Sequence, residues 1–177
     1  MSEYRDILGK SCINRKIVDQ VVLRVQADES DFTEHLYPLL FDTDSKVSWH
    51  AAWVCTHLCK VHPEWFLPYR DDFMKLIQQE GGNEGVKRQI LHILEQIPII
   101  EPLNVGFFDF CLEHMFDMKS PFAVQVICLK LAYKMCLLET ELLPEYKCIL
   151  INTELDYFSS AIKSSVRNIL KKINKNV

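Results

Sequence analysis

One apolar pattern recurs along this chain about every 36 to 44 residues. Its first copy places apolar side chains at positions i, i+4, i+7 and i+11, which share one face of an α-helix. The second copy repeats this spacing 39 residues later, a third follows, and a fourth is shortened to three positions. The four copies are Val47, Ala51, Val54 and Leu58; Val86, Ile90, Ile93 and Ile97; Phe122, Val126, Leu129 and Tyr133; and Val166, Leu170 and Ile173. Repeats of this length are typical of stacked helix pairs.

Each of these helices follows a segment with its own helical pattern, so we predict pairs of a first helix, a turn and a second helix. The first helices are predicted at residues 32–40, 66–77, 107–115 and 142–150. Residues 13–26 form a further candidate second helix, with Ile17, Val21 and Val25 on one face. The residues expected in the core are Val47, Ala51, Val54, Val86, Ile90, Ile93, Val126 and Leu129.

The turns within the pairs carry residues that end one helix and begin the next. Gly81 and Gly82 suit a helix end that needs positive φ. Polar side chains are placed to cap the second helices, with a proline at the first position of one of them. The predicted caps are Ser45, Asn83 and Ser120, and the proline is Pro121. Three prolines fall inside first helices, which they must kink or delay; these are Pro38, Pro68 and Pro144.

Composition indicates a globular helical protein. The chain has 177 residues, of which 49% are hydrophobic, enough to bury a core in a single domain over residues 1–177. No alternating run rich in Val, Ile and Thr is present, so we predict an all-α fold. Neither a signal sequence nor an apolar stretch of the roughly 20 residues that span a bilayer is found. Since most of the seven cysteines lie within helical patterns, we expect a cytoplasmic protein without membrane association.

Several segments resemble HEAT repeats of the armadillo-type (ARM) fold. In the second helix of that family, a capping Asp, Asn or Ser leads into Val and then into apolar residues on one face. The matching segments are TDSKVSWHAAWVCTHL, NEGVKRQILHILEQI and SSVRNILKKI, and HPEWFLPYRDDFMKLI resembles the first helix. The resemblance covers residues 30 to 175 and implies a right-handed α-α superhelix, or solenoid, of about four to five antiparallel helix pairs. A fold of this kind does not specify the ligand.

Charge is segregated between the predicted helices. The second-helix segments 13–26, 46–60, 86–97, 119–138 and 161–177 together carry +13, and since the whole chain carries −4, the rest carries −17. One interpretation is that cations favour helix C-termini while acids solvate an outer face. The other is that second helices line the concave side of a superhelix, as the resemblance implies. That side would then attract an acidic protein segment or a nucleic acid.

The segment WHAAWVCTHLCKVH gathers three His and two Cys in 14 residues, which suggests a zinc site. Helix geometry argues against it. Cys55 and Cys59 share a face, but His57 lies about 200° from Cys55, and His50 and His57 are about 10 Å apart along the axis. We therefore predict no metal and no cofactor, with buried cysteines and surface histidines.

The residues do not point to catalysis. The chain has no G-x-S-x-G, Gly-rich phosphate loop, H-E-x-x-H or zinc ribbon. Bacterial alkylpurine DNA glycosylases share a HEAT-like superhelix and use Trp, Asp and Arg; this chain offers Trp49, Trp53 and Arg88, but only Glu95 as a nearby acid. We therefore predict a protein that is not an enzyme, with the glycosylase as a weaker alternative.

Trp49 and Trp53 lie one turn apart, either as an exposed platform for a peptide or a base, or as part of the core between repeats. The prediction is a protein-interaction or scaffold module that binds an unidentified protein or acidic peptide segment on its concave face. Nucleic acid in the same basic groove is the alternative, which the net charge of −4 disfavours. The expected contacts are Trp49, His50, Trp53, Lys87, Arg88, His92, Lys130, Lys134, Arg167 and Lys171.

Overall fold

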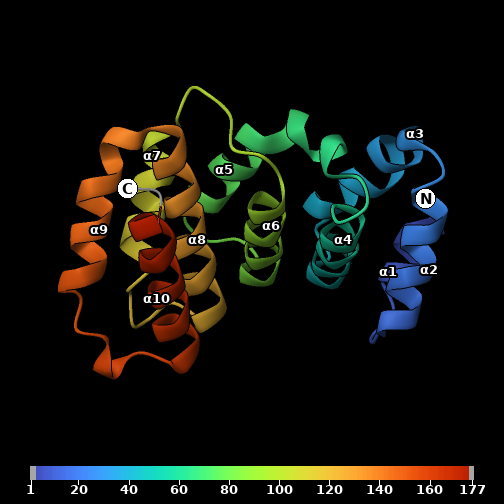
Figure 1. Cartoon of the computed structure of the whole chain (residues 1–177). Coiled ribbons are helices and arrows are strands. Elements are labelled where there is room, and N and C mark those ends of the chain that lie inside the picture. Colours follow the sequence, from blue (N-terminus) through green and yellow to red (C-terminus); the bar gives the residue numbers. More distant parts are fainter. Residues whose placement is uncertain (1–2, 176–177) are drawn as a thin grey trace. The chain divides into compact units, whose positions relative to one another are not determined.

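The computed structural model describes residues 3–175, which form helices and loops without strands, as predicted (Figure 1). The chain divides into two compact units, Met1–Ile97 and Pro98–Val177, and the single domain over residues 1–177 stays a prediction. Unit 1 contains α1 (Glu3–Leu8), α2 (Arg15–Val25), α3 (Glu29–Asp31), η1 (Phe32–Leu36), η2 (Tyr37–Phe41), α4 (Ser45–Leu58), η3 (Pro63–Tyr69), α5 (Arg70–Gln78) and α6 (Glu84–Gln96). Unit 2 contains α7 (Val105–His114), α8 (Phe122–Leu138), η4 (Thr140–Leu142), α9 (Leu143–Asn152), η5 (Leu155–Tyr157) and α10 (Ser160–Lys175).

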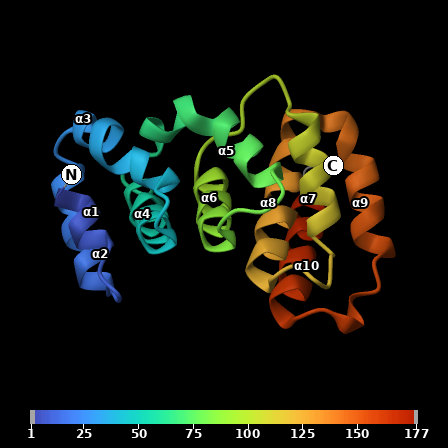
Figure 2. The ribbon, with the colours of Figure 1, turned by 180° about the vertical axis from the view of Figure 1, so that it is seen from behind.

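In unit 1 the second helices lie side by side, with α4 packed between α2 and α6. The first-helix segments, from α3 to η2 and from η3 to α5, form a separate layer, in which η2 packs on α4 and α5 packs on α6 (Figure 2). The predicted helix over residues 13–26 is confirmed as α2, which buries Val21 and Val25.

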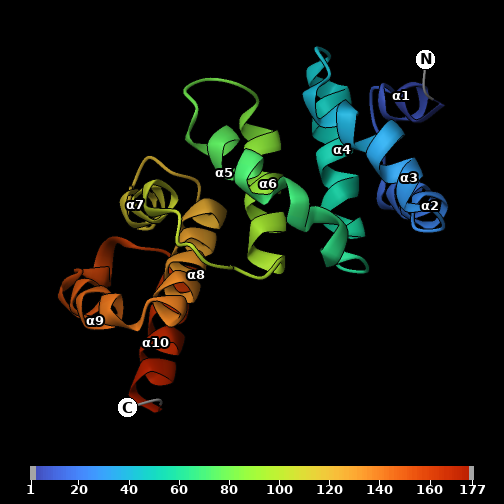
Figure 3. The same cartoon turned by 90° about the horizontal axis from the view of Figure 1, so that it is seen from above.

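In unit 2 the helix α8 is central, and it packs against α7, α9 and α10 (Figure 3). Tyr146 of α9 is buried, and its hydroxyl donates a hydrogen bond of 2.7 Å to the carbonyl oxygen of Leu129 in α8. This bond satisfies a polar group that would otherwise be costly to bury.

Proline divides the first helices of unit 1 into short segments. Pro38 lies in the first turn of the 3₁₀ helix η2, and Pro68 lies inside η3, after which α5 begins. In unit 2, Pro144 stands at the start of α9. Because proline lacks an N–H and its ring clashes with the preceding turn, a regular α-helix does not continue through it. The predicted kinks or late starts are confirmed.

The predicted turn chemistry is confirmed before α6. Gly81 and Gly82 have φ of 75° and 84°, a conformation that glycine adopts without strain. Asn83 caps the helix, because its Oδ1 accepts a hydrogen bond of 2.9 Å from the backbone N–H of Gly85. The Asn83 amide also donates to the Ser45 carbonyl oxygen at 2.9 Å, so the cap links α6 to the start of α4.

Two other predicted caps are wrong, because the helices begin at different residues from those predicted. Asp44 caps α4, accepting from the Lys46 N–H at 2.9 Å, and Ser45 is the first residue of the helix. Ser120 donates to Asp117 instead. The helix α8 begins at Phe122, so Pro121 stands just before its first residue.

The predicted core is confirmed at seven of eight positions, which are each at most 4% exposed: Val47, Ala51, Val54, Val86, Ile90, Ile93 and Leu129. Val126 is only half-buried, and Phe122, the first residue of that copy, is 64% exposed. The reason is that α8 has neighbours on several sides and buries residues around much of its circumference. A single apolar stripe therefore does not describe α8.

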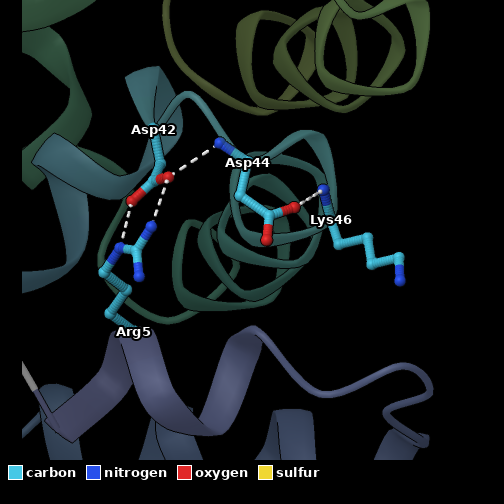
Figure 4. A network of polar contacts seen from close by, with 4 residues as sticks. All are labelled: Arg5, Asp42, Asp44 and Lys46. Carbon is cyan, nitrogen blue, oxygen red and sulfur yellow. Dashed lines mark hydrogen bonds and ion pairs between the residues drawn. The ribbon is translucent and has the colours of Figure 1, made fainter.

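The helix α1 is attached to the loop before α4 by a bidentate ion pair (Figure 4). Arg5 Nε and Nη2 donate to the two carboxylate oxygens of Asp42 at 2.7 and 3.1 Å. Asp42 also accepts from the backbone N–H of Asp44 at 2.8 Å. These hydrogen bonds hold the pKa of Asp42 below its ordinary value; the bond from Arg5 has the largest effect, and the bond from Asp44 the next largest.

We expect this ion pair to make stability depend on pH. Because the pKa of Asp42 is lowered in the folded state, the pair stabilises the fold above about pH 4 and loses this effect as the pH falls through the folded pKa. Arg5→Gln should therefore reduce the free energy of unfolding near pH 7, and the difference from the wild type should shrink below pH 4.

Urea denaturation at several pH values measures this effect. The matched control is Arg15→Gln, which removes an exposed i,i+4 pair with Asp19 and should change stability little. A difference between Arg5→Gln and the wild type that is constant from pH 7 to pH 3 would contradict the prediction.

Candidate functional site

Three aromatic side chains form a row along one face of α4, at positions i, i+4 and i+8. The rings of Trp49 and Trp53 are stacked, with centroids 6.0 Å apart and planes 25° apart. The ring of His57 meets Trp53 edge-on at 6.1 Å. All three residues are half-buried, so each ring both packs against the protein and presents part of its surface to solvent. We call Trp49, Trp53 and His57 the aromatic row.

A groove of about 410 Å³ lies between α4 and α6, beside the aromatic row. Its lining residues are Trp53, Thr56, His57, Lys60, Gln89, His92, Glu95 and Gln96. The groove is therefore aromatic on its α4 side and mostly polar on its α6 side.

The two helices are joined across the groove by side-chain hydrogen bonds. The Thr56 hydroxyl lies 3.0 Å from Gln89 Oε1, and the Gln96 amide donates to the Thr56 carbonyl oxygen at 3.4 Å. Within α6 the same amide donates to the His92 carbonyl oxygen at 2.9 Å. The Gln96 Oε1 is buried and has no hydrogen-bond partner among the described residues. An unpaired buried acceptor is unfavourable.

The pKa of His57 lies below its ordinary value. Burial lowers its pKa, and the nearby Arg15 and Lys60 lower it further, against a raising effect of the hydrogen bond to Trp53. The Nδ1–H donates to the Trp53 carbonyl oxygen at 3.0 Å, so the neutral ring keeps Nε2 as an acceptor. The helix α2, which carries Arg15, packs against α4.

Trp49 closes the other end of the aromatic row against α6. A Cβ added to Gly85 would lie 2.6 Å from Trp49 Cδ1, far inside van der Waals contact. The absence of a side chain at Gly85 therefore allows the indole to lie against the first turn of α6. Trp49 also borders a shallow hollow with Lys46, whose side chain points away from the Asp44 cap (Figure 4).

The predicted contact residues of unit 1 do not all belong to this surface. His50 is 4% exposed, and its Nδ1 donates to the Leu8 carbonyl oxygen at 2.6 Å. The expectation that His50 lies on the surface is wrong, because α1 covers that side of α4. Lys87 borders a different groove, where its ammonium contacts the Gln79 carbonyl oxygen and lies 3.6 Å from Glu84. Arg88 is half-buried and lies one turn before His92 on α6.

The predicted contacts of unit 2 form two i,i+4 pairs. Lys130 and Lys134 lie on α8, and Arg167 and Lys171 lie on α10, which packs against α8. All except the half-buried Lys134 are exposed.

Most residues of the groove were not among the contacts predicted from the sequence. Thr56, Lys60, Gln89 and Gln96 are ordinary polar residues in helices, and only their position on the second helices could have drawn attention to them. Cys55 and Cys59 are buried as predicted, each at most 1% exposed, and burial raises the pKa of the Cys59 thiol to about 12. Cys148 in α9 is exposed, so the expectation that the helix cysteines are buried is wrong at that position. Within residues 3–175, no three His, Cys, Asp or Glu side chains are grouped so that they could hold a metal ion.

The family model of the HEAT repeat domain matches residues 5–173, which extend from α1 to α10. Searches of the curated proteins and of the solved structures found no match. Among the residues that the structure describes, no helix combines the length and apolar character needed to cross a bilayer.

Proposed function

We propose that this chain, which belongs to the HEAT repeat domain family, is a non-enzymatic interaction module that binds a segment of a partner protein beside the aromatic row of α4. HEAT repeats generally mediate protein–protein interaction or scaffolding. The observation that supports this site is the half-exposed aromatic row beside a groove with polar walls.

The groove offers what a peptide segment requires. Tryptophan rings that are partly exposed provide large contact areas and are frequent binding hot spots. The Nε2 of His57, whose Nδ1–H is already used by the Trp53 carbonyl oxygen, is an acceptor for a backbone or side-chain N–H group of a bound segment. A segment with one apolar or aromatic anchor would therefore match this surface.

Charge favours a protein partner over a nucleic acid. Arg15 is paired with Asp19 at 2.7 Å, and Glu95 lies within the groove, where its carboxylate is 3.9 Å from His92 Nδ1. A phosphate backbone is best bound by an uninterrupted basic surface, which these acids interrupt. The cations Lys46 and Lys60 lie near the two ends of the aromatic row, so we propose a segment with an acidic residue beside its anchor.

The proposal narrows the predicted contacts. Trp53 and His92 are retained because they line the groove, Trp49 because it belongs to the aromatic row, and Arg88 because it lies one turn before His92. His50 is left out because it is buried, and Lys87 because it lines a different groove. The cationic positions of α8 and α10 stay predicted contacts. The seven free cysteines, of which Cys12 and Cys148 are exposed, support a reducing cytoplasmic location.

Trp53→Ala should weaken partner binding by at least about 30-fold, the effect of removing a hot-spot residue worth about 2 kcal/mol. Peptides would be selected from a displayed random library with the full chain as bait, and their dissociation constants measured by fluorescence anisotropy. We expect the selected peptides to share an apolar or aromatic anchor with a neighbouring acid.

The matched control is Phe41→Ala, which removes another half-exposed aromatic side chain of unit 1 and should leave the affinity within about twofold of the wild type. Circular dichroism would establish that both variants are folded. Equal affinity of the wild type and Trp53→Ala for the selected peptides would refute the site. Tight, salt-dependent binding of mixed-sequence DNA or RNA, with no peptide selected, would favour the nucleic-acid alternative instead.

A further inference from the structure

A second groove lies on unit 2, between the first helices α7 and α9, which Figure 3 shows on the same side of α8 and α10. Its volume is about 260 Å³. The apolar residues that shape it are Val105, Phe108, Leu112, Leu142 and Ile149. Small-molecule sites are usually about 300–1,000 Å³, so this groove suits an anchoring side chain of a protein better than a metabolite.

The base of the groove is rigid and its rim is open. Tyr146 at the base is 1% exposed and is held by its hydrogen bond to Leu129, and Phe108 is 8% exposed. At the rim, Val105 is 63% exposed. A fixed apolar floor beneath an exposed apolar rim loses little conformational entropy when a partner side chain enters.

The rim also carries a consistent negative charge. Asp109 and Glu145 line the groove and are both exposed. Glu113 on α7 and Glu141 in η4 add exposed acids on the elements that form the groove. Within residues 3–175 none of these four carboxylates forms an ion pair or accepts a side-chain hydrogen bond. Lys147 is the single Lys or Arg in α7, η4 and α9.

We infer that this groove docks an amphipathic helical segment of a partner protein, which inserts apolar side chains and places Lys or Arg beside Asp109 and Glu145. The acidic rim selects a basic partner, since unpaired carboxylates at the edge of an apolar contact gain an ion pair when cations approach. A groove between two helices accepts the apolar face of a third helix. This inference does not rest on the groove of unit 1, because it involves other residues and the opposite charge.

The test uses the full chain and three fluorescein-labelled synthetic peptides of 16 residues. The first is a Leu/Lys peptide with Leu at positions i, i+4, i+7 and i+11, the second replaces every Lys with Glu, and the third scrambles the first so that no apolar face forms. Fluorescence anisotropy should show that the first peptide binds at least tenfold more tightly than the other two.

The double variant Asp109→Lys/Glu145→Lys should weaken binding of the first peptide at least tenfold. Its matched control is Glu154→Lys/Asp156→Lys, which changes the net charge equally at exposed positions outside the groove. Ile149→Ser should also weaken binding at least fivefold, whereas Ile151→Ser, at an exposed residue of the same helix outside the groove, should not. Circular dichroism would establish that each variant is folded.

Equal binding by the scrambled peptide, or equal losses in the two charge-reversal variants, would overturn the inference by showing non-specific attraction. Tighter binding of the Glu peptide would also overturn it. If sedimentation velocity shows a dimer that Asp109→Lys/Glu145→Lys dissociates, the groove is occupied by a second copy of the chain and the inference is again wrong. None of these outcomes bears on the effect of Trp53→Ala at unit 1.

Discussion

Phe32→Ala is expected to lower the free energy of unfolding by about 3–5 kcal/mol, the usual cost of removing a buried aromatic ring. Phe32 is 0% exposed in η1. Its ring centroid lies 4.8 Å from that of Phe66 and 5.9 Å from that of Trp65, both in η3. It therefore joins the two first-helix segments of unit 1, and no smaller side chain at this position would reach both.

Urea denaturation followed by circular dichroism measures this loss, provided that the slope of the transition is unchanged. Phe41→Ala serves as the control, because Phe41 is 52% exposed and has Tyr37 as its one aromatic neighbour among the described residues. Its truncation should cost about 1 kcal/mol or less. If Phe32→Ala lowers the free energy of unfolding no more than Phe41→Ala does, Phe32 does not join the two first-helix segments as described.

Ile90→Ala is expected to lower the free energy of unfolding by about 2–5 kcal/mol. Ile90 is 0% exposed in the middle of α6, the helix that packs against both α4 and α5. Truncation leaves a cavity that only a joint movement of the neighbouring helices could fill. Relaxation around the cavity therefore recovers little of the lost free energy of unfolding.

The control for Ile90→Ala is Leu23→Ala, a truncation of similar size at a residue of α2 that is 63% exposed. It should change stability by about half a kcal/mol or less. Both variants would be measured by urea denaturation. If Ile90→Ala costs less than about half a kcal/mol, the register assigned to α6 is wrong.

Most of the fold could be predicted because helical periodicity is a local property of the chain. The residues of α4 and α6 that face the core repeat every three to four positions, and Val47, Ala51, Ile90 and Ile93 are buried accordingly. Periodicity failed in α8, where neighbours on several sides bury more than one face. Caps were less predictable, since a shift of one or two residues in a helix start moves the cap from Ser45 to Asp44.

The candidate site was predicted in part. Trp49 and Trp53 were identified from their spacing of one turn, which places them on one face whatever the helix packs against. Their exposure was left open by the sequence, and the structure shows that both are half-buried. The polar partners Gln89 and Gln96 have no local signal, because they become part of a groove only when α6 lies beside α4.

By itself the sequence determined which segments are helices, which faces are apolar and that the chain resembles HEAT repeats, because these features depend on residues within a few turns of one another. The tertiary structure alone decided that α1 buries His50, that Lys87 turns towards the Gln79 carbonyl, and that Gly85 makes room for Trp49. Each of these three contacts is made between residues of separate helices or between residues on the two sides of a turn. The surface of such a protein is therefore set by contacts between elements, whereas its helices are set within them.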